Sequence, residues 1–200
     1  MFFPEKDGSP NDAPEALRTL KGKRVLQHIP ARIDLSAVDA EVYATALALY
    51  IDLSVPHDTM EKICVVIDAR PGNGWSNIPA PLLVPFIKHA ARLLNDLHPE
   101  RLDSCILFPV PVVAKYLWSA VRYVTHAFLL RMSHQHYLTY SASGKRPFLD
   151  PSTANRIQLI TGWAGVKSPV PKDLELYLEK EAIEWMEGKR LSLFVEPHKK

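Results

Sequence analysis

Residues 98–122 read HPERLDSCILFPVPVVAKYLWSAVR, and this stretch decides the fold that we expect for the chain. The apolar run at 105–108 is typical of a buried strand, and Pro109 ends it because proline has no backbone N–H to donate. Apolar residues then recur at helical spacing over 112–121 and predict a helix. The stretch therefore predicts a strand that leads through a short turn into a helix.

The same order of strand and helix repeats along the chain. Three further apolar runs predict strands, at residues 25–29, 63–67 and 157–160. Three stretches with apolar residues every three or four positions predict helices, at residues 36–52, 79–97 and 173–187. Ser36 is the expected N-cap of the first helix, and the polar Gln27 and His28 place the first strand near a sheet edge. Such alternation implies right-handed crossovers. The predicted class is α/β, with a mainly parallel sheet flanked by helices.

The composition describes one ordinary globular domain. The chain has 200 residues, of which 47% are hydrophobic, and 24 Lys and Arg against 22 Asp and Glu give a net charge of +2. A charge so close to zero indicates no nucleic-acid partner. The longest largely apolar stretch, residues 42–51, is half of the about 20 residues that a bilayer span needs. Residues 1–21 are expected to be a disordered polar lead-in, and residues 22–197 a single domain.

The sequence contains no motif that predicts an enzyme. It lacks G-x-S-x-G, H-E-x-x-H and the phosphate-binding G-x-x-x-x-G-K-[ST], so we expect no catalytic residue, no cofactor and no metal. Gly72-Asn73-Gly74 follows a strand, but Asn77 stands where a dinucleotide turn has its third glycine. His134 and His136 could face a metal from one strand, yet no carboxylate or cysteine lies within about a dozen residues of them.

The two cysteines and the amino terminus indicate the compartment. Cys64 and Cys105 each lie inside an apolar run, which is typical of buried, reduced thiols in a cytosolic protein. The first residues lack the basic and continuous apolar regions of a signal peptide. The expected location is cytoplasmic.

Several separated blocks resemble the CRAL-TRIO lipid-binding domain, the family of phosphatidylinositol-transfer and tocopherol- or retinal-binding proteins. Residues 98–102 match the family's Y-P-E-R-L, with His98 in place of Tyr, and residues 65–68 match its V-V-x-D. Residues 22–25 are similar to its opening G-R-P-V. Eight later residues match its Trp-bearing helix and its V-K-P-F-L-D-x-x-T-x-x-K-I pattern, namely Trp118, Val121, Pro147, Phe148, Leu149, Asp150, Thr153 and Ile157.

The resemblance implies a mainly parallel sheet and helices that enclose an apolar pocket. The implied function is the binding, and transfer between membranes, of a phospholipid such as phosphatidylinositol or of another small lipid. Transfer would require transient contact with a membrane surface. The candidate pocket residues are Val65, Ile67, Ile106, Phe108, Leu117, Trp118, Phe148, Leu149 and Leu159. The same side chains could simply pack a core, because periodicity does not distinguish a core from a cavity wall.

By motif position, the resemblance also implies three candidate contacts with a lipid headgroup. Glu100 is the acidic residue of P-E-R, and either Arg122 or Arg146 takes the place of the lysine before P-F-L-D. An arginine can meet a phosphate with two donors, so the exchange is chemically reasonable without being equivalent. Glu100 could instead form a structural contact with Arg101 or with a helix end.

Two departures from the family pattern keep other functions open. The helical region that usually precedes the domain is missing, so we expect a minimal version or a fragment. Divergent members of the fold bind small GTPases or their regulators, and a protein-interaction domain is therefore the alternative function. An α/β enzyme is the weakest interpretation, because no nucleophile or cofactor motif is present.

The second departure is an insertion at residues 123–146, which separates Arg122 from Pro147. It contains three basic residues and no acid, and therefore accounts for the positive net charge. It is either a surface loop, whose closure costs little, or a translated intron. Sequencing the transcript distinguishes the two.

Overall fold

The computed structural model describes residues 5–6, 15–55, 59–98, 100–119 and 155–194, and its centre is a four-stranded parallel sheet. In spatial order the strands are β3 (Arg24–His28), β4 (Ile63–Asp68), β5 (Leu102–Val110) and β6 (Ile157–Thr161). All three neighbouring pairs are parallel. The predicted α/β class is confirmed, and β3 lies at the edge of this sheet as expected.

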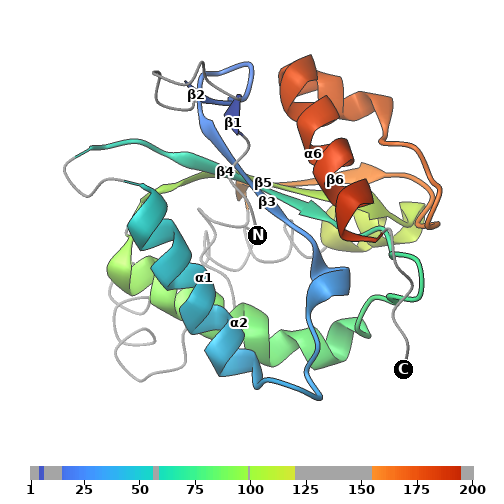
Figure 1. Cartoon of the computed structure of the whole chain (residues 1–200), viewed down its shortest axis with the longest axis horizontal. Helices are drawn as coiled ribbons and strands as arrows, with labels where there is room; N and C mark the ends of the chain where they lie inside the picture. Colours follow the sequence, from blue (N-terminus) through green and yellow to red (C-terminus); the bar gives the residue numbers. More distant parts are fainter. Residues whose placement is uncertain (1–4, 7–14, 56–58, 99, 120–154, 195–200) are drawn as a thin grey trace, which may run out of the picture.

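Helices cover the two faces of the sheet (Figure 1). On one face α1 (Ala40–Ser54) and α2 (Ala80–Leu97) pack against each other. On the other face lie the short 3-10 helix η2 (Lys172–Leu176) and α6 (Lys180–Leu193). Right-handed crossovers that advance in one direction leave their helices on one side of a sheet, which explains why α1 and α2 share a face. We call the two sides the α1–α2 face and the α6 face.

Two apolar clusters form the core, one on each face of the sheet. Leu26 and Ile63 belong to the cluster on the α1–α2 face, whereas Val25, Cys64 and Val66 belong to the cluster on the α6 face. Neighbouring residues divide in this way because successive side chains of a strand point to opposite faces. The uninterrupted apolar run of β4 thus serves both cores, as a strand buried on both faces should.

The first helix begins later than predicted. The expected start was Ser36, but α1 starts at Ala40, with Asp39 at the N-cap position. The Ser36 hydroxyl and backbone N–H both donate to the Asp34 carboxylate, at 2.5 and 3.0 Å. Ser36 therefore stabilises the turn before the helix and does not cap it. A 3-10 helix, η1 (Pro30–Arg32), links β3 to this turn.

The helix predicted over 173–187 is wrong as a single element, because the chain breaks between η2 and α6. At the break the Tyr177 carbonyl accepts a hydrogen bond from the Leu20 N–H (2.9 Å), and Thr19 pairs with Leu178 in an isolated bridge. These backbone groups cannot serve an α-helix at the same time.

Part of the expected lead-in belongs to the packed structure. Leu17 and Thr19 are buried, and two short antiparallel strands precede them, β1 (Glu5–Lys6) and β2 (Glu15–Ala16). The packed chain therefore begins before the residue 22 boundary.

Residues 112–119 form the described part of the helix predicted over 112–121, and the insertion at 123–146 lies outside the described residues.

His28, at the carboxyl end of β3, is buried on the α1–α2 face. Its ring stacks on Phe86 of α2, with ring centroids 5.6 Å apart. Nδ1 is buried and has no hydrogen-bond partner within the described structure. Burial lowers the pKa of His28 to about 4. The ring is therefore neutral in the folded protein above about pH 4.

We predict that His28 makes the protein less stable as the pH falls below 6.5, which is the pKa of this side chain in the unfolded protein. Between pH 6.5 and about 4 the unfolded chain binds a proton at His28 and the folded chain does not, so acid favours unfolding. Urea titrations at pH 7 and pH 5 should show a His28-dependent loss of about 2 kcal/mol. His28→Phe keeps the stacking on Phe86 and should remove this part of the loss. An equal pH dependence in both proteins would contradict the prediction.

Candidate functional site

The α6 face of the sheet is closed. Ile106 and Phe108 of β5 and Ile160 of β6 are each at most 4% exposed there. They pack in one cluster with residues of η2 and α6, among them Leu174 and Met186. This face therefore serves as a core.

The α1–α2 face is closed over β3 but incompletely covered over β4, β5 and β6. The register pairs Leu107 with Leu159 and Cys105 with Ile157, and partners in register share a face. All four side chains are half-buried, as is Ile67, which pairs with Leu107 from β4. We call Ile67, Cys105, Leu107, Ile157 and Leu159 the open strip. It is a band of apolar side chains that remains partly accessible.

A hollow of about 290 Å³ lies at the carboxyl end of the open strip. Thr161 lines it from the end of β6, and residues 112–119 supply its other side through Val112, Lys115, Tyr116 and Ser119. Thr161 lies two residues after Leu159 and therefore on the same face. The hollow thus continues the strip towards a basic side chain, Lys115, which the sequence analysis did not select.

The structure divides the predicted pocket residues between the two faces. Val65, Ile67 and Leu159 lie on the α1–α2 face, whereas Ile106 and Phe108 belong to the core under α6. Within residues 112–119, Leu117 is exposed and Trp118 is half-buried. Phe148 and Leu149 lie outside the described residues. One pocket on the sheet therefore cannot use all five strand residues.

Of the three predicted headgroup residues, the structure describes only Glu100. It is exposed in the turn between α2 and β5, where its φ of 61° is a left-handed conformation. The neighbouring Arg101 donates a hydrogen bond to the Glu61 carbonyl at 3.1 Å. Arg122 and Arg146 lie outside the described residues. Glu100 thus stands at the amino end of β5, at the opposite end of the strand from the hollow beside Lys115.

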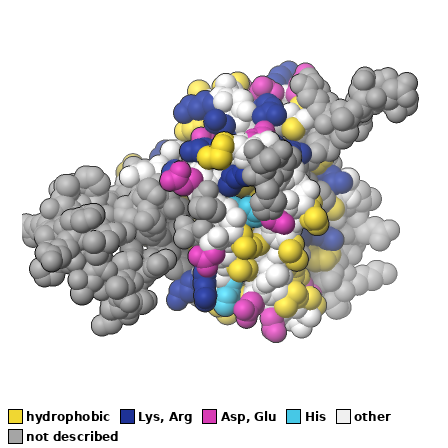
Figure 2. All heavy atoms as spheres, turned by 90° about the vertical axis from the view of Figure 1, so that its left-hand side faces the viewer, with side chains coloured by type: hydrophobic (Ala, Val, Ile, Leu, Met, Phe, Trp, Pro, Cys, Tyr) yellow, Lys and Arg dark blue, Asp and Glu magenta, His cyan; other side chains and the backbone are white. Residues whose placement is uncertain are grey.

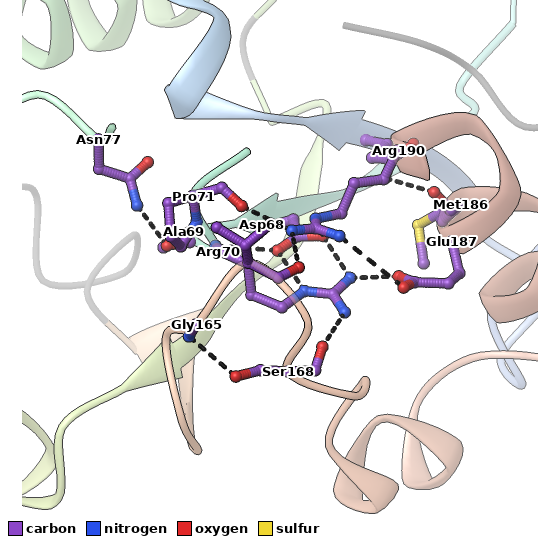
Figure 3. Close-up of polar contacts among 12 residues, drawn as sticks. Asp68, Ala69, Arg70, Pro71, Asn77, Gly165, Ser168, Met186, Glu187 and Arg190 are labelled. Atoms are coloured by element: carbon purple, nitrogen blue, oxygen red, sulfur yellow. Dashed lines mark hydrogen bonds and ion pairs between the residues drawn. The ribbon is translucent and has the colours of Figure 1, made fainter. Parts of the chain in front are cut away.

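A cluster of buried charges that no sequence motif predicts lies at the carboxyl end of β4 (Figure 3). Asp68 and Arg70 are each 1% exposed, and the Arg70 guanidinium donates to both carboxylate oxygens of Asp68, at 2.9 and 2.6 Å. The same guanidinium donates to Glu187 of α6 at 2.5 Å and to the Ser168 carbonyl at 2.8 Å. Arg70 therefore joins the sheet, α6 and the loop before η2.

Arg190, one turn further along α6, completes this cluster. Its Nη2 donates to the carbonyls of Pro71 and Val166, at 2.7 and 3.0 Å, and its Nε lies 3.6 Å from the Asp68 carboxylate. Glu187, at 29% exposure, is the member nearest to solvent. We call Asp68, Arg70, Glu187 and Arg190 the buried charge cluster. Two cations and two anions make it neutral overall.

The pKa shifts agree with a structural role for the cluster. Burial disfavours the charged form of Arg70, but its bonds to Asp68 and Glu187 outweigh burial and raise its pKa. Burial and repulsion from Arg70 lower the pKa of Arg190. An arginine keeps its proton in either case. The cluster therefore holds fixed charges that bind α6 to the sheet.

Three other features singled out in the sequence are the two cysteines, the glycines after β4 and the possible metal ligands. Burial raises the pKa of Cys64 to about 11 and that of Cys105 to about 12, and both are free thiols as predicted. Gly72 makes a tight turn with Trp75, and a side chain at Gly72 would collide with the Phe194 ring, so this glycine serves packing. Among the described residues, no group of three or more His, Cys, Asp or Glu side chains could hold a metal ion. His134 and His136 lie outside them.

The comparison with family models decides the identity of the domain. The model of the CRAL/TRIO domain matches residues 18–131, more than half of the chain. The chain belongs to the CRAL/TRIO family. The match begins at Arg18, beside the buried residues of the lead-in, and ends before residues 147–162, whose resemblance to the family stays a prediction. No curated protein and no solved structure gave a match.

Membership of the CRAL/TRIO family gives the function in general terms, which is the binding or transport of a lipophilic ligand. No described helix is both long and apolar enough to cross a bilayer. The open strip, on the less completely covered face of the sheet, is one part of the described domain where an apolar ligand could lie.

We predict that the losses of stability on removing Asp68 and on removing Arg70 are not additive. Arg70→Leu leaves the buried Asp68 carboxylate without its main partner, and we expect a loss of about 3–5 kcal/mol in the free energy of unfolding. The double variant Asp68→Leu/Arg70→Leu should lose less than the two single losses together, because no unpaired carboxylate remains. Urea unfolding followed by tryptophan fluorescence measures both.

Glu187→Gln is the milder control. Because this side chain is partly exposed, the substitution should lower the free energy of unfolding by about 1 kcal/mol. Strictly additive losses in Asp68→Leu and Arg70→Leu would show that the pair does not act as a unit.

Proposed function

We propose that the CRAL/TRIO domain of this chain binds the acyl chains of a phospholipid against the open strip and carries the lipid between membranes. The observation that supports this is the asymmetry of the sheet. Ile106, Phe108 and Ile160 are closed off beneath α6, whereas Leu107 and Leu159, on the same two strands, stay half-buried. An acyl chain on the strip would complete the burial that the described residues leave unfinished.

The energetics of lipid release favour exchange at a membrane. A buried methylene contributes about 0.8 kcal/mol, so a diacyl lipid with about 30 methylenes gains on the order of 20 kcal/mol on leaving water. Release into water would therefore be extremely slow. Exchange at a bilayer avoids this cost, and transient contact with a membrane surface is part of the proposal.

For the headgroup we propose inositol, with Glu100 as an acceptor for its hydroxyl groups. A carboxylate only accepts hydrogen bonds when ionised, which suits the hydroxyls of a sugar-like ring. The support is the family motif together with the exposed position of Glu100 at the amino end of β5. Arg122 or Arg146 would then meet the phosphate.

We predict that purified protein carries lipid in a near-stoichiometric amount, and that polar substitutions on the open strip remove it. Organic extracts of the full chain would be quantified by mass spectrometry for the parent and for Leu107→Gln/Leu159→Gln. We expect the double variant to retain at most about a tenth of the lipid, because each amide would lie unpaired against the acyl chain. Leu176→Gln, at an exposed site on η2, is the matched control and should retain all of it.

Circular dichroism would establish that both variants are folded. Equal lipid in the strip variant and in the control would place the ligand elsewhere, and lipid-free parent protein would contradict the proposed function.

We predict that Glu100→Gln lowers transfer of phosphatidylinositol between vesicles by roughly tenfold, since bonds to a charged group contribute about 1.5–3 kcal/mol. Phosphatidylcholine has no inositol hydroxyls, so its transfer should be unchanged and serves as the internal control. Unchanged transfer of both lipids would remove Glu100 from the site. An equal fall for both would make its role structural.

A further inference from the structure

The helix α1 has two apolar faces, of which the core uses only one. Ala44, Leu47, Ala48 and Ile51 are buried against the sheet and α2. On the opposite side, Val42 and Leu49 are each 55% exposed, Leu53 is 86% exposed, and Ala46 is exposed as well. At 100° per residue these four side chains point directly away from the buried ones. We call Val42, Ala46, Leu49 and Leu53 the outer stripe.

The spacing of the outer stripe is that of a helix-pairing seam. Its members follow one another at intervals of four, three and four residues, which are the a and d positions of a heptad. The stripe is about 16 Å long, and Ala46 at its middle leaves space for the close approach of another helix. Figure 2 shows hydrophobic side chains gathered on the lower half of the face where α1 and α2 end, with both acidic and basic side chains at their borders.

The charged residues near the outer stripe indicate which kind of partner could bind to it. Residues 33–61 contain six acidic residues and no Lys or Arg. Three of the acids lie near the stripe in sequence, Asp39 and Glu41 at the amino end of α1 and Asp52 near its carboxyl end. A second copy of α1 would bring like charges together, and an anionic membrane would be repelled. A helix with basic side chains beside its apolar residues would be attracted.

We propose that the outer stripe of α1 is a docking surface for an amphipathic helix of another protein, one whose apolar a and d positions are flanked by Lys or Arg. The mode is helix-to-helix packing with complementary charges at the rim. The stripe points away from the sheet, whereas the open strip lies on the sheet itself. The inference is therefore independent of the proposed lipid function, and either can fail without the other.

Two synthetic helices provide the test, used as probes against the full chain. Both have about 21 residues with Leu at every a and d position, and they differ only at the flanking e and g positions, which are Lys in one and Glu in the other. We expect fluorescence anisotropy to show the Lys peptide bound at least about tenfold more tightly than the Glu peptide, with a preference that weakens as salt screens the charges.

Two matched variants localise the binding. Leu49→Gln/Leu53→Gln should weaken binding of the Lys peptide by at least about tenfold, since apolar anchors carry most of the energy of such contacts. Leu191→Gln on α6 is the control, because Leu191 is also 55% exposed, and it should bind the peptide as the parent does. Both stripe positions are exposed, so folding should be preserved, and circular dichroism verifies it.

Four results would overturn the proposal. Equal affinity for the two peptides would remove the charge argument, and undiminished binding by the stripe variant would remove the surface. A parent dimer that Leu49→Gln/Leu53→Gln converts to a monomer would make the occupant a second copy. Flotation of the parent, but not of this variant, with vesicles containing phosphatidylserine would make it a membrane.

Discussion

The ion pair between Asp68 and Arg70 is the constraint on which the arrangement of the layers depends. Both side chains are removed from water, so each needs the other, and Arg70 also takes Glu187 of α6 and the Ser168 carbonyl as partners. Desolvating charges is expensive, and the arrangement is acceptable only because the buried guanidinium groups lie close to carboxylates at fixed places. The cost of breaking the cluster therefore fixes the position of α6 against β4, more specifically than apolar packing alone could.

Fixing α6 in this way makes the two faces of the sheet unequal. Beneath α6, Ile106 and Phe108 are closed off, while Leu107 and Leu159 on the opposite face remain half-buried. A carrier of lipophilic ligands needs one rigid apolar wall and one side from which the ligand can leave. In the proposed function, the closed α6 face would be the rigid wall, and the α1–α2 face would be the accessible surface.

The order of strands and helices was predictable because each element has its own periodicity or apolar run, and the family was recognisable from motifs spread along the chain. The sequence alone could not show whether Ile106 and Phe108 share a pocket with Leu159. A continuous apolar strand gives no sign of which of its faces is closed. The buried charge cluster was equally out of reach, since Asp68 and Arg70 meet Glu187 and Arg190 across more than a hundred residues. The break at Tyr177 depends on a pairing with Leu20, again a contact distant in sequence.

The composition of α1 shows why the existence of a helix can be predicted from the sequence while the burial of its faces cannot. A helix that is apolar all round is usually buried all round, and the pattern from Val42 to Ile51 fits that expectation. In the folded domain, however, α1 forms an outer layer, so Ile51 faces the core while Leu49 and Leu53 face solvent. Solubility alone would favour polar residues at these outer positions. The acidic residues of the helix instead lie beside the outer stripe, and none of them interrupts it. An apolar seam kept intact within an acidic border is what recognition of a basic helix requires.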